Sequence, residues 1–193
     1  MNVPLFIVLD QIPGRAFLDS SALQTLQDYG EFIYDGGEIL QDDRIWSIPD
    51  GFQNAEALRK IMLVGGRGSL QFVLSRNSLQ EVLDRGRYNY LQWALEVLDY
   101  WESCLASYED GGFAFSGHGA ALAAKLRRTR FGYLSEKDAR LIQDAVLLEC
   151  DVFLTMERRL PQNAVHLERE LKIKVVQPVG YWDLLGPWAA LPA

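Results

Sequence analysis

Apolar residues along the chain occur in two patterns, short continuous runs and longer stretches in which they recur every three or four positions. The short runs are rich in branched and aromatic side chains, which is typical of buried strands. We therefore predict strands at residues 5–9, 15–19, 69–75, 151–155 and 173–178. The longer amphipathic stretches predict helices at residues 20–30, 55–63, 75–83, 87–107, 134–150 and 162–172.

Strands and helices alternate along most of the chain, and this order is typical of a parallel sheet that is covered by helices on both faces. We predict a three-layer α/β/α fold with about four to five parallel strands, in a single domain that covers residues 1–193. Residues 34–52 are acidic, contain glycine and proline and lack a period, so we expect a surface loop there. Two further segments, "GGRG" at 65–68 and "YWDLLGPW" at 181–188, predict a turn before a strand and a short closing turn.

The composition is that of an ordinary globular protein, with 49% hydrophobic and 23% charged residues. No apolar run approaches the roughly 20 residues that span a bilayer, and residues 1–15 lack the basic start and cleavage site of a secretory signal. We therefore expect a cytoplasmic protein that does not bind membranes. The net charge of −7 argues against nucleic-acid binding by the whole surface, although residues 125–130, "KLRRTR", form a local basic stretch. Cys104 and Cys150 have no metal-ligand spacing and are expected to be free thiols.

Four acidic residues fall where an open α/β sheet binds its ligands, outside the carboxyl ends of the strands. Asp19 ends the second predicted strand, and Glu157 lies two residues past the fourth. Glu81 lies in the helix that follows the third predicted strand, and Asp138 lies in the first turn of the helix that precedes the fourth. The sequence therefore places four carboxylates from separate segments at one edge of the sheet.

The position of Asp138 on its helix distinguishes it from the neighbouring Asp144. The helix has a continuous apolar face formed by Leu141, Ile142, Ala145 and Leu148. Asp138 lies on this face, so we expect its carboxylate to point inward at the edge of the sheet. Asp144 lies six residues further on, rotated by about 240° at 3.6 residues per turn, and falls off the face. We take Asp138 as the site candidate and Asp144 as a surface residue.

Each acid on or before a helix also has a structural explanation. Asp19 precedes two serines and is suited to cap the helix that begins there. Ser135 and Asp138 have the spacing of a capping box, and so do Ser78 and Glu81. Helix capping alone does not explain why the acids gather at the same edge of one sheet.

Glu157 is followed directly by Arg158 and Arg159. One interpretation is a surface ion pair, which contributes roughly 0–1 kcal/mol. The other is that the two arginines hold the phosphates of a substrate or neutralise the acidic cluster. The sequence leaves both interpretations open.

Three segments resemble successive motifs of the PIN-domain family of metal-dependent ribonucleases: "AFLDSSAL", "FVLSRNSLQEVL" and "LSEKDARLIQDAVLLECDVFLTMERRL". In that family an aspartate follows the first strand, a glutamate lies in the helix after the second, and another aspartate opens a later helix. Asp19, Glu81 and Asp138 match these positions. A Thr-x-Asp motif closes the next strand, and it is matched by Thr155 and Glu157, where glutamate replaces the usual aspartate.

The resemblance also covers the end of the chain, "IKVVQPVGYWDLL", which is similar to the last strand and closing turn of a PIN domain. Residues 31–68 and 106–131 exceed a minimal domain of this family, so we expect insertions there. The resemblance implies a PIN-like fold over most of the chain.

The resemblance implies a site for Mg²⁺ or Mn²⁺ that Asp19, Glu81 and Asp138 hold directly or through water. Crowded carboxylates repel one another unless a cation lies between them, and hard divalent cations prefer oxygen ligands. Such a cation lowers the pKa of a coordinated water and stabilises the charge that develops on a phosphate. Glu157 is expected to reach a second metal ion or only to orient water, and Thr155 to support a carboxylate or a water by hydrogen bonding.

The sequence thus predicts a metal-dependent endoribonuclease that hydrolyses single-stranded RNA. Similar proteins often act as the toxin of a bacterial toxin–antitoxin pair, so the resemblance implies a small antitoxin-like protein partner and a homodimer. The alternative, indicated by Glu157 and by the acidic surface, is a catalytically weak PIN-like domain that binds or regulates other proteins.

Overall fold

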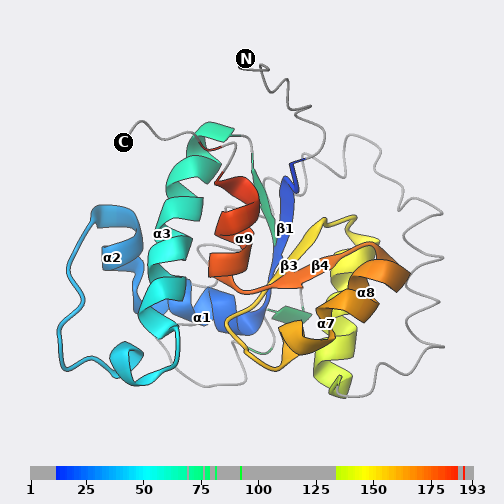
Figure 1. Cartoon of the computed structure of the whole chain (residues 1–193), viewed down its shortest axis with the longest axis horizontal. Coiled ribbons are helices and arrows are strands. Elements are labelled where there is room, and N and C mark those ends of the chain that lie inside the picture. The colour runs from blue at the N-terminus through cyan, green and yellow to red at the C-terminus, as the bar shows by residue number, and fades with distance from the viewer. Residues whose placement is uncertain are drawn as a thin grey trace, which may run out of the picture.

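The computed structural model describes residues 12–68, 70–75, 77–78, 81, 92, 134–186 and 189. These residues form an α/β fold around one sheet of four parallel strands, in the spatial order β2-β1-β3-β4 (Figure 1). The strands are β1 (Arg15–Leu18), β2 (Gln71–Val73), β3 (Val152–Leu154) and β4 (Lys174–Val176). The predicted parallel sheet with helices on both faces is confirmed. Several predicted features lie outside the described residues: the strand at 5–9, most of the helix at 87–107, the insertion at 106–131 and the basic stretch at 125–130.

The central strands are buried on both faces, which divides the core into two clusters. In β1, Ala16 and Leu18 belong to one cluster and Phe17 to the other, and none of the three is more than 1% exposed. This division follows from the alternation of side chains along a strand. The strand β3 repeats it, and its Phe153 stacks on Phe17 with the ring centroids 5.3 Å apart.

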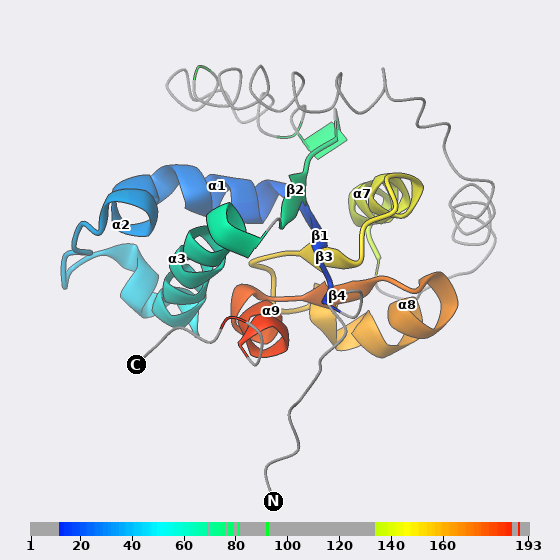
Figure 2. The same cartoon turned by 90° about the horizontal axis from the view of Figure 1, so that it is seen from above.

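The first cluster is covered by the helices of the first third of the chain and by the last helix (Figure 2). These helices are α1 (Ser20–Asp28), α2 (Gly30–Asp35), η2 (Arg44–Ser47, a 3₁₀ helix), α3 (Gly51–Gly68) and α9 (Pro178–Leu185). Tyr181 of α9 is fully buried, and its hydroxyl donates to the carbonyl of Pro13 at 2.7 Å. This bond ties the last helix to the segment that enters β1.

The second cluster is covered by α7 (Glu136–Leu147) and α8 (Ala164–Leu171), and the 3₁₀ helix η3 (Leu160–Asn163) precedes α8. Leu141, Ile142 and Ala145 are buried, as the apolar periodicity predicts. Because α7 ends just before β3 begins, its first turn lies at the carboxyl edge of the sheet (Figure 1). None of the helices in the described ranges is long and apolar enough to cross a membrane.

The turn predicted at 65–68 was wrong, because a helix covers this segment, and α9 covers residues 181–185 of the expected closing turn. Helix α3 continues to Gly68, and a Cβ added at Gly65 would lie 2.8 Å from the ring of Phe72. Glycine therefore lets α3 pass close to β2 instead of ending the helix. At the end of the chain, Pro178 occupies the first turn of α9, where a missing N–H carries no penalty.

The segment at 34–52 combines a surface loop with a contribution to the core. Residues 36–43 are irregular, as expected, but η2 buries Ile45 to 2% exposure. The hydroxyl of Tyr29 donates to Asp43 at 2.7 Å and Asp43 caps η2, so the loop is fastened to the end of α1. These contacts shape one wall of the candidate site described below.

Candidate active site

The strand order places a topological switch point between β1 and β3, because the chain continues from β1 to β2 on one side and to β3 and β4 on the other. Open α/β sheets bind ligands outside the carboxyl ends of the strands at such a point. Asp19 directly follows β1 and Thr155 directly follows β3. The Thr155 hydroxyl donates to Oδ2 of Asp19 at 2.5 Å, which joins two residues that are 136 positions apart.

Asp19 is held in place by further hydrogen bonds from α1. Its Oδ1 accepts from the backbone N–H of Ala22 and from the Ser21 hydroxyl, both at 2.8 Å. The bond from Ala22 makes Asp19 the N-cap of α1, which is the structural role that the sequence also predicted for it. Its own N–H donates to the carbonyl of Leu154 at 3.1 Å. The side chain, in a residue only 5% exposed, therefore has a fixed orientation.

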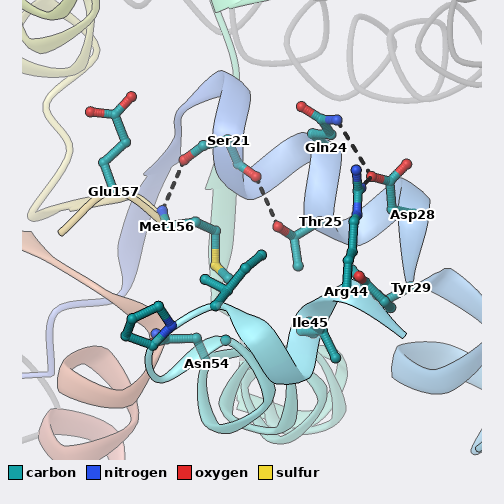
Figure 3. Close-up of a pocket in the computed structure, with 13 residues that line it drawn as sticks. Ser21, Gln24, Thr25, Asp28, Tyr29, Arg44, Ile45, Asn54, Met156 and Glu157 are labelled. Atoms are coloured by element: carbon teal, nitrogen blue, oxygen red, sulfur yellow. Dashed lines mark hydrogen bonds and ion pairs between the residues drawn. The ribbon is translucent and has the colours of Figure 1, made fainter. Parts of the chain in front are cut away.

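The loop after β3 is bonded to the same cluster. Oγ of Ser21 accepts from the N–H of Met156 at 2.9 Å (Figure 3). The Thr155 hydroxyl accepts from the N–H of Glu157 at 3.0 Å. The two hydroxyls thus place the backbone of Glu157 beside Asp19. Both hydroxyls donate to the Asp19 carboxylate, the kind of contact expected of Thr155. The only signal for Ser21 in the sequence is the pair of hydroxyl residues after Asp19.

Burial raises the pKa of the Asp19 carboxyl from 3.8 to about 6. Hydrogen bonds from Thr155, Ala22 and Ser21 stabilise the charged form and limit this increase, whereas the negative charge of Glu157 adds to it. The site therefore contains a buried acid whose ionisation is opposed by its surroundings and by a second acid.

Glu81 also reaches this edge of the sheet. Its Oε2 accepts a hydrogen bond from the hydroxyl of Ser20 at 2.8 Å, and Ser20 directly follows Asp19. The sequence also allowed Glu81 to form a capping box with Ser78. Ser78 instead forms hydrogen bonds with Ser75. Ser20 is a second hydroxyl that sequence reasoning did not assign to the site.

Asp138 lies at the same edge of the sheet but is engaged locally. Its Oδ2 accepts from the N–H and hydroxyl of Ser135, at 3.2 and 2.8 Å, while the Ser135 hydroxyl accepts from the N–H of Asp138 at 3.1 Å. The capping box that the sequence offered as an alternative is therefore formed. Asp144, expected at the surface, is half-buried and accepts from the side chain of Asn77 at 2.8 Å.

The structure thus brings Asp19, Thr155 and Glu157 together, joins Glu81 to them through Ser20, and leaves Asp138 in its helix cap. Arg158 and Arg159 follow Glu157 and are exposed. In the part of the chain that the structure describes, no three histidine, cysteine, aspartate or glutamate side chains form a group arranged to hold a metal ion.

The surroundings of Asp19 nevertheless fit a divalent cation chemically. Its Oδ2 accepts one hydrogen bond, from Thr155, whereas a carboxylate oxygen can accept two. A cation on this oxygen would oppose both effects that raise the pKa of Asp19, because it stabilises the charged form and neutralises the repulsion from Glu157. Hard cations such as Mg²⁺ and Mn²⁺ suit this set of oxygen donors.

A cavity of about 290 Å³ extends from this cluster along α1. Ser21 and Glu157 line one end, and Gln24, Asp28 and Arg44 line the other (Figure 3). Its walls also include the apolar side chains Ile45, Ile48, Pro49 and Met156. The candidate site is therefore an acidic centre at the switch point with an adjoining, partly apolar cavity.

Comparison of the chain with models of protein families, with curated proteins and with solved structures gives no significant match. The site is therefore interpreted from its geometry and from the motif resemblance alone.

Proposed function

We propose that this protein is a metal-dependent endoribonuclease of the PIN type that hydrolyses single-stranded RNA. One observation carries the proposal: a buried aspartate at the switch point of a parallel sheet, bonded to the threonine that follows the adjacent strand, with a second acid two residues beyond. Asp19, Thr155 and Glu157 occupy these three positions.

Mg²⁺ or Mn²⁺ would bind to Asp19, with Glu81 and Asp138 as further ligands, directly or through water. When bound, the cation supplies an activated water and stabilises negative charge on the phosphate. To bind the cation directly, Asp138 would have to give up its hydrogen bonds to Ser135. A contact with the cation through water therefore suits it better. Glu157 is exposed at the edge of the cluster, where it orients water or assists a second cation.

The chain's hydroxyl residues position the acids. Thr155 donates a hydrogen bond to Asp19 and so fixes the orientation of its carboxylate. Ser20 holds Glu81 toward the same edge, and Ser21 fixes the loop after β3 against α1. Arg158 and Arg159 lie directly beyond Glu157, where a substrate backbone enters, and we assign them to its phosphates. A small antitoxin-like protein and a second copy of the chain remain the partners that the resemblance implies.

The test is cleavage of a mixed RNA pool with Mn²⁺ and with EDTA. We expect cleavage by the wild type only with Mn²⁺, its loss in Asp19→Asn and a clear reduction in Asp138→Asn. Asp183→Asn is the matched control, because Asp183 is exposed on α9, away from the cluster, and its activity should equal that of the wild type. Equal cleavage by all four proteins, or none by any of them, would refute the assignment, and the second result would favour the protein-binding alternative.

A further inference from the structure

The cavity beside Asp19 has the features of a binding site for one neutral heterocycle. Its volume of about 290 Å³ lies at the small end of ligand pockets, which suits one base or nucleoside. Apolar side chains form part of the wall, and flipped or splayed bases are commonly held between such side chains and hydrogen-bonding groups.

Asn54 provides the second observation. It lines the cavity, is 1% exposed, and its Oδ1 accepts from the N–H of Val179 at 3.2 Å. This bond fixes the orientation of the amide, so that Nδ2 is the atom left as a donor. Within the described part of the chain, no hydrogen-bond acceptor is paired with that nitrogen. Because Asn54 lines the cavity, this donor is available to an acceptor on a molecule that occupies it.

The polar and charged groups around the cavity make two other kinds of ligand less suitable. A phosphate would meet the carboxylates of Asp28 and Glu157, while Arg44 already forms an ion pair with Asp28. A lysine or arginine side chain from a protein partner offers donors only, and would leave Nδ2 of Asn54 unpaired. The carbonyl and ring nitrogens of a base supply acceptors, and its exocyclic amino groups supply donors to the carboxylates.

We propose that this cavity binds one unstacked base of a single-stranded RNA, next to the phosphate at Asp19. The proposal rests on the proposed function for the identity of the ligand, and it adds a determinant of base preference. The connection between the two sites is Ser21, which lines the cavity and donates to Asp19 at 2.8 Å. A base in the cavity therefore fixes which phosphodiester reaches the acidic centre.

The experiment uses the full chain in EDTA, titrated separately with adenosine, guanosine, cytidine and uridine and followed by amide resonances in NMR. Nucleosides carry no phosphate and EDTA removes metal, so binding is measured apart from hydrolysis. We expect at least one nucleoside to shift the resonances of Ser21, Met156 and Glu157. Asn54→Asp keeps the oxygen that accepts from Val179 but replaces the donor, and should weaken this binding by at least about tenfold.

A second variant tests the cavity without changing a buried polar group. Ile48 lines the cavity and is 49% exposed, so Ile48→Trp should fill part of it and abolish nucleoside binding. Val165→Trp is the matched control, because Val165 is 73% exposed on α8 and lies outside the cavity. This control should bind like the wild type.

The outcomes separate the two proposals. Absence of binding by all four nucleosides, or equal affinity in wild type and Ile48→Trp, overturns the base-binding proposal. So does a response to N-acetylarginine methylamide in place of the nucleosides, which would assign the cavity to a basic side chain of a protein. Nucleoside binding at the cavity in a protein that fails to cleave RNA with Mn²⁺ would refute the nuclease alone. Cleavage with the same base preference in Ile48→Trp and wild type would refute the base pocket alone.

Discussion

Asp19 and Asp138 both cap the start of a helix at the carboxyl edge of the sheet, but their surroundings differ. Asp19 is 5% exposed and is bonded to Thr155, which follows the neighbouring strand β3. Asp138 is half-buried and exchanges its hydrogen bonds with Ser135, three residues earlier. The bonds of Asp138 are local and need only a helix, whereas the bond from Thr155 to Asp19 needs the whole fold. The comparison indicates that Asp19 is the centre of the site and that Asp138 is a peripheral member.

The largest expected effect is on RNA cleavage. Asp19→Asn should lower the rate with Mn²⁺ by more than about 100-fold, because it removes the central ligand of the proposed metal site. Asp138→Asn should lower it by about 10–100-fold, which is typical of groups that act on a metal through water. The measurement is the initial rate on one labelled RNA, and a larger loss in Asp138→Asn than in Asp19→Asn would reverse the comparison.

The next effect is on stability without metal. The pKa of Asp19 is about 6 in the folded chain and 3.8 as the reference value, so the unfolded chain ionises first as the pH rises. The protonated Asp19 therefore contributes to the free energy of unfolding in full below pH 3.8. This contribution, about 3 kcal/mol, is lost as the pH rises through about 6. Urea unfolding in EDTA at about pH 4 and pH 7.5 should show this loss in the wild type and not in Asp19→Asn.

Added Mn²⁺ sharpens that measurement. A cation that binds the ionised Asp19 should raise the free energy of unfolding of the wild type at pH 7.5, because it binds only the folded chain. The same addition should leave Asp19→Asn unchanged. Equal stabilisation of both proteins would show that the cation binds at a site that does not include Asp19.

A smaller effect is expected at the threonine. Thr155→Val removes the donor to Asp19 and the acceptor of the Glu157 N–H, and should destabilise the folded chain by about 1–3 kcal/mol. It should also move the pKa of Asp19 upward, because the lost hydrogen bond stabilised the charged form. The pH dependence of cleavage should then shift to higher pH, while Thr155→Ser keeps the wild-type profile. A shift in neither variant would show that the hydroxyl does not control Asp19.

The smallest effect is expected at the local cap. Ser135→Ala should lower the free energy of unfolding by about 1 kcal/mol, since it removes the N-cap of α7. RNA cleavage should remain within about twofold of the wild type, because Asp138 keeps its carboxylate. Thermal unfolding and the cleavage assay measure the two effects, and Ser135→Asn, which preserves a cap, serves as the control. A large loss of cleavage in Ser135→Ala alone would give this end of the site a greater role.

The sequence predicted the described fold well where hydrophobic periodicity controls the structure. The strands at 15–19 and 151–155 and the helix at 134–150 were all found, because their apolar residues are buried at the predicted spacing. It failed where a tertiary contact decided the conformation. "GGRG" at 65–68 has the composition of a turn, but these residues continue a helix. The glycine at position 65 is explained by the ring of Phe72, which leaves no room for a Cβ.

The candidate site was predicted in its acids but not in its supporting groups. The rule that ligands bind at the carboxyl ends of strands led to Asp19 and to the loop that contains Glu157. It did not identify the hydroxyls of Ser20 and Ser21, because a serine after a strand is equally suited to a helix cap. Nor could it identify the cavity, whose walls come from α1, η2 and the loop after β3 and meet only in the folded chain.

The bond between Thr155 and Asp19 also has a consequence for the timing of synthesis. The first acid is made early, but its partner follows 136 residues later, directly after β3. A chain still attached to the ribosome therefore lacks a complete centre until the segment around Glu157 has emerged. Under the proposed function, this order of assembly would keep the chain inactive toward the messenger and ribosome that are producing it during most of translation.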